Sequence, residues 1–216
     1  YLKSKNTNLI LNLGSKKNYI VKNGCVGATC GRFAGRISGA KFSIDREKFL
    51  LSKNEGDSTL HGGKKGFDKH VWRKINHKKN KITYMLKSKH LDQGFPGNLT
   101  TYCSYHICRK DLIIRYEYFS DRKTHVNLTN HSYWNLNKNK KYNIFNHDLK
   151  INSNKYLEVN KKLIPTGKIK STKNTIYDFE KFSNLNEKIK KLSKNYYQKG
   201  FDLTYMVKKT PNEYIA

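Results

Sequence analysis

Acidic residues are scarce in this chain, and so are proline and long apolar runs. Only 16 Asp and Glu stand against 44 Lys and Arg, which gives a formal net charge of +28. With three prolines in 216 residues, nothing marks a linker between domains. No apolar run approaches the roughly 18 residues of a membrane-spanning helix, and no signal-peptide pattern opens the chain. The sequence therefore predicts a single domain over residues 1–216, located in the cytoplasm and without a membrane partner.

The excess of positive charge raises the question of a nucleic-acid partner. Most of the basic residues are lysines spread along the whole chain among Asn, Ile and Tyr. Surfaces that bind phosphates are typically local, contain arginine and alternate with stacking aromatics. We therefore expect a solvated basic surface with no specific nucleic-acid partner, and nucleic-acid binding stays an alternative that charge alone supports.

The few cysteines form two pairs of equal spacing, a pattern that raises the question of a zinc site with His106 as a further ligand. Structural zinc ligands prefer about two to four residues between them on tight turns, whereas residues five apart on a strand point to opposite faces. We expect free thiols, a reducing compartment and no metal. The four cysteines are Cys25, Cys30, Cys103 and Cys108.

Aromatic residues make up 12% of the chain, and alternating runs rich in Tyr, Phe and Ile recur between turn signals. This pattern is typical of β-sandwiches and barrels. The clearest hairpin joins residues 99–107 to 112–119 through a short polar connection. One helix is expected over 184–196, where Leu185, Ile189 and Leu192 share a face. Further strands are expected at residues 8–13, 69–72, 81–86, 125–128, 143–151, 156–159 and 201–207, with a second hairpin in 37–51.

Both ends of the chain are abrupt. The first residue is Tyr1 rather than Met, and the predicted strand 8–13 follows almost at once. Ala216 comes only a few residues after the predicted strand 201–207. We expect the chain to be an incomplete copy of a longer protein.

Two segments combine glycine with arginine or histidine in ways that strand packing does not require. Residues 27–37 contain glycines that permit close backbone approach, and Arg32 and Arg36 offer planar donor forks suited to polyhydroxylated or anionic ligands. Residues 60–63 place His61 on a glycine-rich loop shortly before Trp72. A histidine beside an indole suits a sugar site, because aromatic faces stack on the apolar faces of pyranose rings. A third glycine-rich segment, residues 94–99, is expected to be a structural turn.

The most informative segment is residues 126–136, Val-Asn-Leu-Thr-Asn-His-Ser-Tyr-Trp-Asn-Leu. Here His131 lies among side chains that can orient its ring and stack on a ligand, which is the environment of a general acid near neutral pH. The remaining histidines have no such neighbours and are expected to be structural or solvated; they are His70, His77, His90, His106, His125 and His147.

These segments, in this order, resemble the aldose 1-epimerase family of the galactose-mutarotase type, which carries Asn-Arg-Ile, Leu-His-Gly-Gly and Asn-His-Ser-Tyr segments. The resemblance runs from about Asn8 to Val207. It implies an all-β fold, a large antiparallel β-sandwich truncated at its ends. It also implies an isomerase that interconverts the α and β anomers of hexoses such as galactose and glucose by acid/base ring opening. The matching segments also include residues 66–69, 94–99, 163–167, 177–179 and 200–202.

The resemblance also implies a role for each matching residue. His131 would be the general acid at the ring oxygen, and His61 would assist catalysis by donating a hydrogen bond to a sugar oxygen. Arg36 would donate to the sugar as well, while Asp202 would accept from its hydroxyls and Tyr133, with the neighbouring Trp134, would wall the cleft. The reaction requires no cofactor and no metal. The expected partner is a small-molecule hexose, and the expected state is a monomer or weak dimer.

The chain departs from the family pattern at three points. Gly35 replaces the usual Asn, and Leu203 replaces the usual His. The family's general base is a Glu well after the Gly-Phe-Asp segment, where this chain has ended; Glu213 has the wrong context. Two alternatives therefore stay open: a truncated, catalytically impaired homologue that binds carbohydrate or is a remnant, and an epimerase acting on hexose phosphates.

Overall fold

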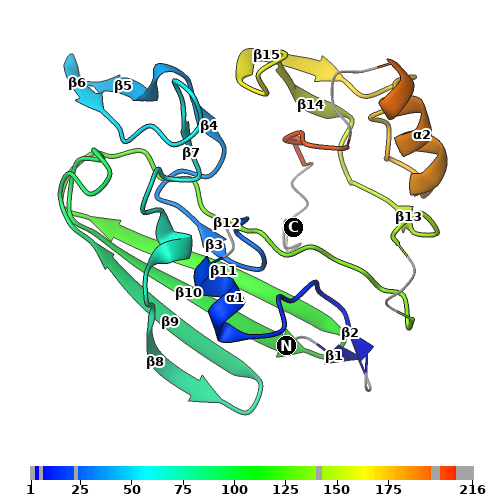
Figure 1. The fold of residues 1–216 in the computed structure, drawn as a ribbon, viewed down its shortest axis with the longest axis horizontal. Helices are drawn as coiled ribbons and strands as arrows, with labels where there is room; N and C mark the ends of the chain where they lie inside the picture. The colour runs from blue at the N-terminus through cyan, green and yellow to red at the C-terminus, as the bar shows by residue number, and fades with distance from the viewer. Residues whose placement is uncertain (1–2, 5–6, 22–23, 140–142, 196–199, 208–216) are drawn as a thin grey trace. The chain divides into compact units, whose positions relative to one another are not determined.

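The computed structural model describes residues 3–4, 7–21, 24–139, 143–195 and 200–207 (Figure 1). The chain divides into two compact units. We call residues 12–133 the central unit, and residues 1–11 together with 134–216 the terminal unit. Strands greatly outnumber helices among the described residues, so the prediction of an all-β protein is confirmed.

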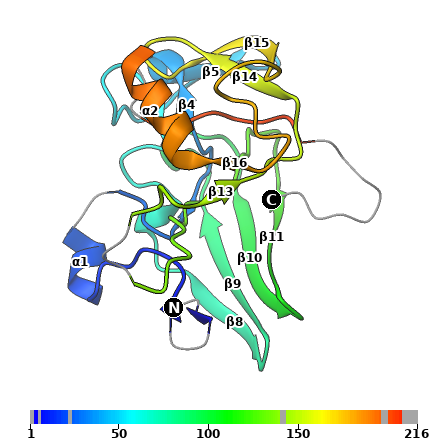
Figure 2. The same cartoon turned by 90° about the vertical axis from the view of Figure 1, so that its right-hand side faces the viewer.

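A four-stranded antiparallel sheet is the largest element of the central unit, and its strands run side by side in the order β11-β10-β9-β8 (Figure 2). The hairpin predicted from the sequence is its strongest pair, because β10 and β11 are in register over their whole length. Buried residues alternate along the first half of β10, as expected where one face of a strand meets the core. The strands are β8 (Arg73–Lys78), β9 (Lys81–Ser88), β10 (Leu99–Cys108) and β11 (Asp111–Ser120).

Three short antiparallel pairs complete the β-structure of this unit. The pair β5–β6 is the hairpin expected within residues 37–51. The other two pairs join segments that are far apart in the sequence, and they bring the Gly-Arg, His-Gly-Gly and Asn-His-Ser-Tyr segments together. The pairs are β3 (Thr29–Cys30) with β12 (Thr129–Asn130), β4 (Arg36–Ile37) with β7 (Thr59–Leu60), and β5 (Lys41–Ile44) with β6 (Glu47–Leu50).

Two apolar clusters form the core of the central unit. One contains Phe95, which is completely buried, together with Ala40 and Leu51. The other contains Phe67 and Leu99, both almost completely buried, and receives Trp72, Val126 and Leu128 at its edge. Burial of a Phe or Leu side chain contributes about 1.5 to 3 kcal/mol, so these clusters anchor the loops that carry the site. Two 3-10 turns, η1 (Ser38–Ala40) and η2 (Phe67–Lys69), supply residues to them.

Among its described residues, the terminal unit contains three short strand pairs and an aromatic core. Phe179 is 1% exposed, and its ring meets Phe201 edge to face at 5.0 Å. Tyr156 and Tyr177 pack beside them, with ring centroids 5.0 Å apart. The pairs are β1 (Lys3–Ser4) with β2 (Thr7–Asn8), β13 (Asp148–Leu149) with β16 (Ser183–Asn184), and β14 (Lys155–Val159) with β15 (Pro165–Ser171).

The described residues contain two α-helices, α1 (Lys16–Val21) and α2 (Leu185–Asn195). Helix α2 confirms the predicted amphipathic helix. It begins after Asn184, whose Oδ1 accepts the Asn186 N–H at 3.1 Å, and it buries Leu192 completely. Across the described ranges, neither helix has the length and apolar character that a bilayer crossing demands.

Several predicted strands are wrong or much shorter than expected. Lys69 ends the 3-10 turn η2 and residues 70–72 are irregular, and 125–128 make only an isolated bridge at Asn127. Residues 8–13, 143–151 and 201–207 are likewise mostly irregular. Asparagine side chains explain part of this, because Asn12 and Asn143 accept backbone N–H groups two residues on and form turns instead of ladders.

Candidate functional site

Residues from the His-Gly-Gly and Asn-His-Ser-Tyr segments meet at an open hollow of about 570 Å³ in the central unit. We call this space the histidine hollow, because His61 and His131 line it together with Tyr133. Its volume lies in the range of about 300 to 1,000 Å³ that is typical of small-molecule sites. The other lining residues are Gly24, Cys25, Asn54, Leu60, Gly63, Lys64, Asp68 and Lys69.

His61 is positioned by hydrogen bonds on both sides of the β4–β7 pair. The Asn54 amide holds the preceding residue, since its Oδ1 accepts the Leu60 N–H at 2.7 Å and its Nδ2 donates to the Leu60 carbonyl at 2.9 Å. The His61 N–H donates to the Gly35 carbonyl at 3.1 Å, and His61 Nδ1 accepts the Gly35 N–H at 3.2 Å. Because Nδ1 is an acceptor, the neutral ring carries its proton on Nε2.

Packing requires a glycine directly after His61. Gly62 has a φ of +89° and lies directly against the Gly31 carbonyl, so a Cβ at this position would overlap that oxygen. The same carbonyl accepts the Phe67 N–H at 3.0 Å. The Gly31 oxygen therefore lies where the motif segments 27–37, 60–63 and 66–69 meet. Only a residue without a side chain fits beside it at position 62.

Substituting Gly62 by Ala should lower the free energy of unfolding by about 1 to 3 kcal/mol more than substituting Gly56 by Ala, because the added methyl group must displace backbone. Gly56 is the matched control: it lies in the same unit, has a positive φ of +55° and has open space around its Cβ position. Urea unfolding of the two variants measures the difference. Equal losses would show that the backbone conformation alone, and not the contact with Gly31, requires glycine at position 62.

His131 follows directly after β12, and backbone hydrogen bonds hold it on both sides. Its N–H donates to the Ala28 carbonyl at 2.8 Å, and its carbonyl accepts the Gly27 N–H at 2.9 Å. The His131 and His61 rings are perpendicular, at 88°, with centroids 5.2 Å apart. The Tyr133 ring lies 5.1 Å from the His131 ring on a tilted plane. The structure therefore brings together three of the five predicted site residues.

Arg36, the fourth predicted residue, lies on β4 directly opposite Leu60 and forms a two-point ion pair with Glu55. Its Nε and Nη2 donate to the two carboxylate oxygens at 2.5 and 2.9 Å. Arg36 does not line the histidine hollow, although it neighbours His61 across the strand pair. Its hydrogen bond to a sugar stays a prediction. Glu55 was not singled out from the sequence, since a lone Glu in a polar turn carries no signal.

Asp202 and Trp134 belong to the terminal unit. Asp202 is exposed and follows Phe201, whose ring packs on Phe179. Trp134 forms an isolated antiparallel bridge with Ile10. The roles expected for Asp202 and Trp134 in sugar binding stay predictions.

Arg32 corrects one expectation from the sequence, because its donor fork faces the protein core and not a ligand. The side chain is 2% exposed and donates to the carbonyls of the turn at residues 95–97 and to Ser88 and Lys89. Burial lowers its pKa to about 10, so the guanidinium stays charged at neutral pH. Arg32 therefore fixes the Gly-Phe-Pro-Gly turn, which confirms that this turn is structural.

The four cysteines are free thiols, and two of them lie next to the histidine hollow. The Cys30 thiol hydrogen-bonds to Cys25 and lowers the pKa of Cys25, which lines the hollow beside Asp68. Cys103 is buried on β10, where burial raises its pKa. Within the ranges that the structure describes, no three His, Cys, Asp or Glu residues are arranged to hold a metal. Cys25 and Asn54 are lining residues that the motifs did not reveal, whereas Asp68 lies in the matching segment 66–69 but had no role assigned from the sequence.

Comparison with solved structures defines the fold. The chain is similar to the GalM/aldose epimerase homologue from C. elegans, with a TM-score of 0.85 and 26% identity over 95% of this chain and 62% of that one. It is also similar to galactose 1-epimerase from Lactobacillus acidophilus, with a TM-score of 0.82 and 26% identity over 94% of this chain and 61% of that one. The protein is therefore an all-β protein with the fold of these sugar epimerases, as the sequence predicted.

Sequence comparison supplies the family. The model of the aldose 1-epimerase family matches residues 2–215. Galactose mutarotase from Sus scrofa is 33% identical over 94% of this chain, and aldose 1-epimerase from Escherichia coli K12 is 36% identical over 79% of it. The chain belongs to the aldose 1-epimerase family. It spans 58% of the Sus scrofa protein and 49% of the Escherichia coli protein, and a single domain over residues 1–216 stays a prediction.

Proposed function

We propose that this protein is an aldose 1-epimerase that interconverts the α and β anomers of hexoses such as galactose and glucose. The observation that supports this function best is the pair of imidazoles, 5.2 Å apart and perpendicular, that lines a hexose-sized hollow. Both residues are held by hydrogen bonds to the backbone of the same glycine-rich segment, residues 27–35: His131 through its own backbone, and His61 through its backbone and its ring. A site built on fixed backbone contacts holds its reacting groups in place before the substrate arrives.

In the proposed reaction, the bond between the anomeric carbon and the ring oxygen breaks and re-forms. His131 gives a proton to the ring oxygen, and the anomeric hydroxyl gives its proton to solvent water, leaving an open-chain aldehyde. His61 donates from Nε2 to a sugar oxygen on which charge develops. After rotation about the bond to the aldehyde carbon, the hydroxyl formed from the ring oxygen attacks the opposite face of the aldehyde and returns its proton to His131, while the aldehyde oxygen takes a proton back from water. Arg36 holds sugar hydroxyls, and no cofactor or metal takes part.

Polarimetry tests this function. Fresh α-D-glucose or α-D-galactose is mixed with the protein, and the optical rotation is followed to its equilibrium value. We expect the rotation to change faster than in buffer, in proportion to protein concentration. A rate equal to that of buffer at all protein concentrations would contradict the proposal.

A second candidate is a carbohydrate-binding protein without catalysis. Asp68 is the only carboxylate that lines the histidine hollow in the described part of the chain, and no Glu is among the lining residues of that part. Loss of a general base typically lowers a rate by about 10² to 10⁴. Shifts in the NMR spectrum of the protein on adding galactose, together with an unchanged rate of rotation, would favour this candidate.

A further inference from the structure

Two free cysteines, Cys25 and Cys30, lie on either side of a tight turn at the histidine hollow. Cys25 is half-buried and lines the hollow, whereas Cys30 is completely buried on β3. The Ala28 N–H donates to the Cys25 carbonyl at 3.0 Å, so the chain turns between the two cysteines. Residues five apart on a continuous strand would point to opposite faces, but the turn brings the two thiols into a hydrogen bond. The two sulfur atoms are therefore neighbours, and only Cys25 lies at an open surface.

The two thiols differ in acidity. The hydrogen bond from Cys30 lowers the pKa of the Cys25 thiol, and the positive charge of Lys69 lowers it as well. Burial and Asp68 oppose this shift without reversing it. The same hydrogen bond raises the pKa of Cys30, and burial raises it further. Because the thiolate is the reactive form of cysteine, Cys25 is the nucleophile of the pair and Cys30 stays protonated.

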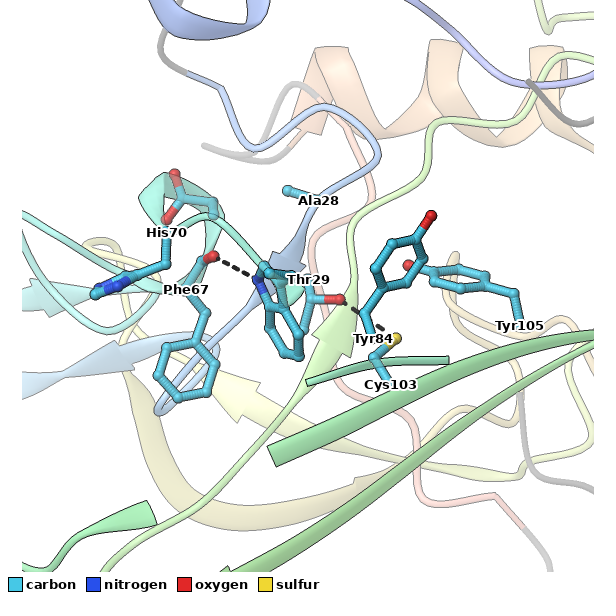
Figure 3. Close-up of a pocket in the computed structure, with 9 residues that line it drawn as sticks. Ala28, Thr29, Phe67, His70, Tyr84, Cys103 and Tyr105 are labelled. Carbon is cyan, nitrogen blue, oxygen red and sulfur yellow. Dashed lines mark hydrogen bonds between the residues drawn. The ribbon is translucent and has the colours of Figure 1, made fainter. Parts of the chain in front are cut away.

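The Cys30 end of the turn is fixed by its neighbours. Cys30 pairs with Thr129 across the β3–β12 pair. The preceding residue, Thr29, is buried and lines a second pocket of about 250 Å³, where its hydroxyl donates to Cys103 Sγ at 3.7 Å (Figure 3). A covalent bond between the two thiols would therefore displace Cys25 and the turn that follows it, while β3 keeps its place.

The same turn holds His131. The Gly27 N–H donates to the His131 carbonyl at 2.9 Å, and the Ala28 carbonyl accepts the His131 N–H at 2.8 Å. Gly27 and Ala28 both lie between the two cysteines in the chain. A displacement of the turn is therefore transmitted to the backbone of His131, and small displacements of a reacting group have large effects on a rate.

We propose that Cys25 is an oxidation site for hydroperoxides, with Cys30 as the thiol that resolves it, and that the resulting disulfide displaces the turn that holds His131. The oxidation site stands on the two cysteines alone. Its effect on anomerisation rests on the proposed function, because it assumes that His131 takes part in the reaction.

The reaction takes one hydroperoxide for each disulfide. The Cys25 thiolate attacks the terminal oxygen, the O–O bond breaks, and this oxygen stays on sulfur as a sulfenic acid. The departing alkoxide or hydroxide takes up the proton that Cys25 had released. The Cys30 sulfur then attacks the Cys25 sulfur, the S–O bond breaks, and the leaving hydroxide becomes water with the Cys30 proton. The two thiols lose two electrons, which the peroxide gains, and a dithiol reductant reverses the change.

Peptide mapping of the unaltered protein tests the site without any measurement of activity. The protein is treated with hydrogen peroxide, its remaining thiols are alkylated, and its peptides are weighed at successive times. We expect Cys25 and Cys30 to become linked, with the loss of two hydrogen atoms, on the order of tenfold faster than Cys108 is oxidised. Cys108 is the matched control, because it is also a partly buried free thiol and does not line the hollow. Equal rates at Cys25 and Cys108, or oxidation of Cys25 without a link to Cys30, would overturn the inference.

The variant Cys30→Ser tests the resolving role. Serine is close in size to cysteine and cannot form a disulfide, so the sulfenic acid of Cys25 should accumulate and be trapped by dimedone. The unaltered protein should give little of this adduct, since Cys30 removes the sulfenic acid. An equal yield of the adduct in both proteins contradicts the role of Cys30.

The rate of optical rotation links the oxidation site to His131. Peroxide should slow the anomerisation of glucose by the unaltered protein about 10- to 100-fold, and dithiothreitol should restore the rate. The rate of Cys25→Ser should be the same before and after peroxide, whereas Cys108→Ser should respond as the unaltered protein does. A disulfide between Cys25 and Cys30 that leaves the rate unchanged overturns the displacement of His131.

The outcomes separate this inference from the proposed function. If glucose rotation is accelerated but no link between Cys25 and Cys30 forms, the inference fails and the proposed function stands. If the link forms in a protein that accelerates rotation in neither redox state, the oxidation site is supported and the catalytic proposal is contradicted.

Discussion

Replacing His131 by Asn is expected to slow hexose anomerisation by about 10²- to 10⁴-fold, the range that a positioned general acid contributes. The amide can still donate a hydrogen bond, but it cannot deliver a proton to the ring oxygen. The backbone bonds of residue 131 to Ala28 and Gly27 do not involve the imidazole, so the fold should be retained. Initial rates of optical rotation, measured with α-D-glucose at several concentrations, give kcat and KM.

The substitution His131→Asn should lower kcat more than it changes KM, because proton transfer occurs only in the transition state. His77→Asn is the matched control: His77 is exposed on β8 and does not line the histidine hollow. It should keep the rate of the unaltered protein. If both variants have the same rate, His131 is not the acid.

Replacing Arg32 by Met is expected to lower the free energy of unfolding by more than about 3 kcal/mol. Met has a similar length and no donors, so the carbonyls that Arg32 now serves become buried acceptors without partners, each costing about 1 to 3 kcal/mol. The three carbonyls of residues 95–97 lie 2.7 to 3.5 Å from Arg32 Nη1. Equilibrium urea unfolding followed by circular dichroism measures the change.

Arg115→Met provides the comparison for this prediction. Arg115 is 68% exposed in its side chain and forms an exposed ion pair with Glu117 at 3.1 Å. Such pairs contribute little, so its loss should change the stability by no more than about 0.5 kcal/mol. A similarly small loss of unfolding free energy for Arg32→Met would show that water satisfies the carbonyls of the turn in place of the guanidinium. The hydrogen bonds of Arg32 would then not be what stabilises the turn.

The two arginines of one segment illustrate where sequence reasoning ends. Arg32 and Arg36 are four residues apart and have identical side chains, and from the sequence both were expected to face a ligand. In the structure Arg32 points into the core, and Arg36 pairs with Glu55. The difference arises from which loops pack on each side of the segment, and no local pattern encodes that packing.

The local elements were predictable. The β10–β11 hairpin and helix α2 depend on periodicity and turn residues within about 20 residues of chain, so their signals are contained in the sequence. The pairs β3–β12 and β4–β7 have only two residues per strand and join distant segments. Strands this short show no alternation, and tertiary contacts alone define them.

The sequence by itself determined the all-β class, the family resemblance and the histidines of the site, because these depend on residue types and order. Only the tertiary structure decided that His61 and His131 face each other, and that Trp72 lies in a pocket beside them instead of in the same hollow. The reason is physical: the β3–β12 pair brings residues about 100 positions apart into contact, and the Gly31 carbonyl contacts Gly62 and Phe67, more than 30 positions away. Where such contacts form depends on the packing of whole segments, which no single motif contains.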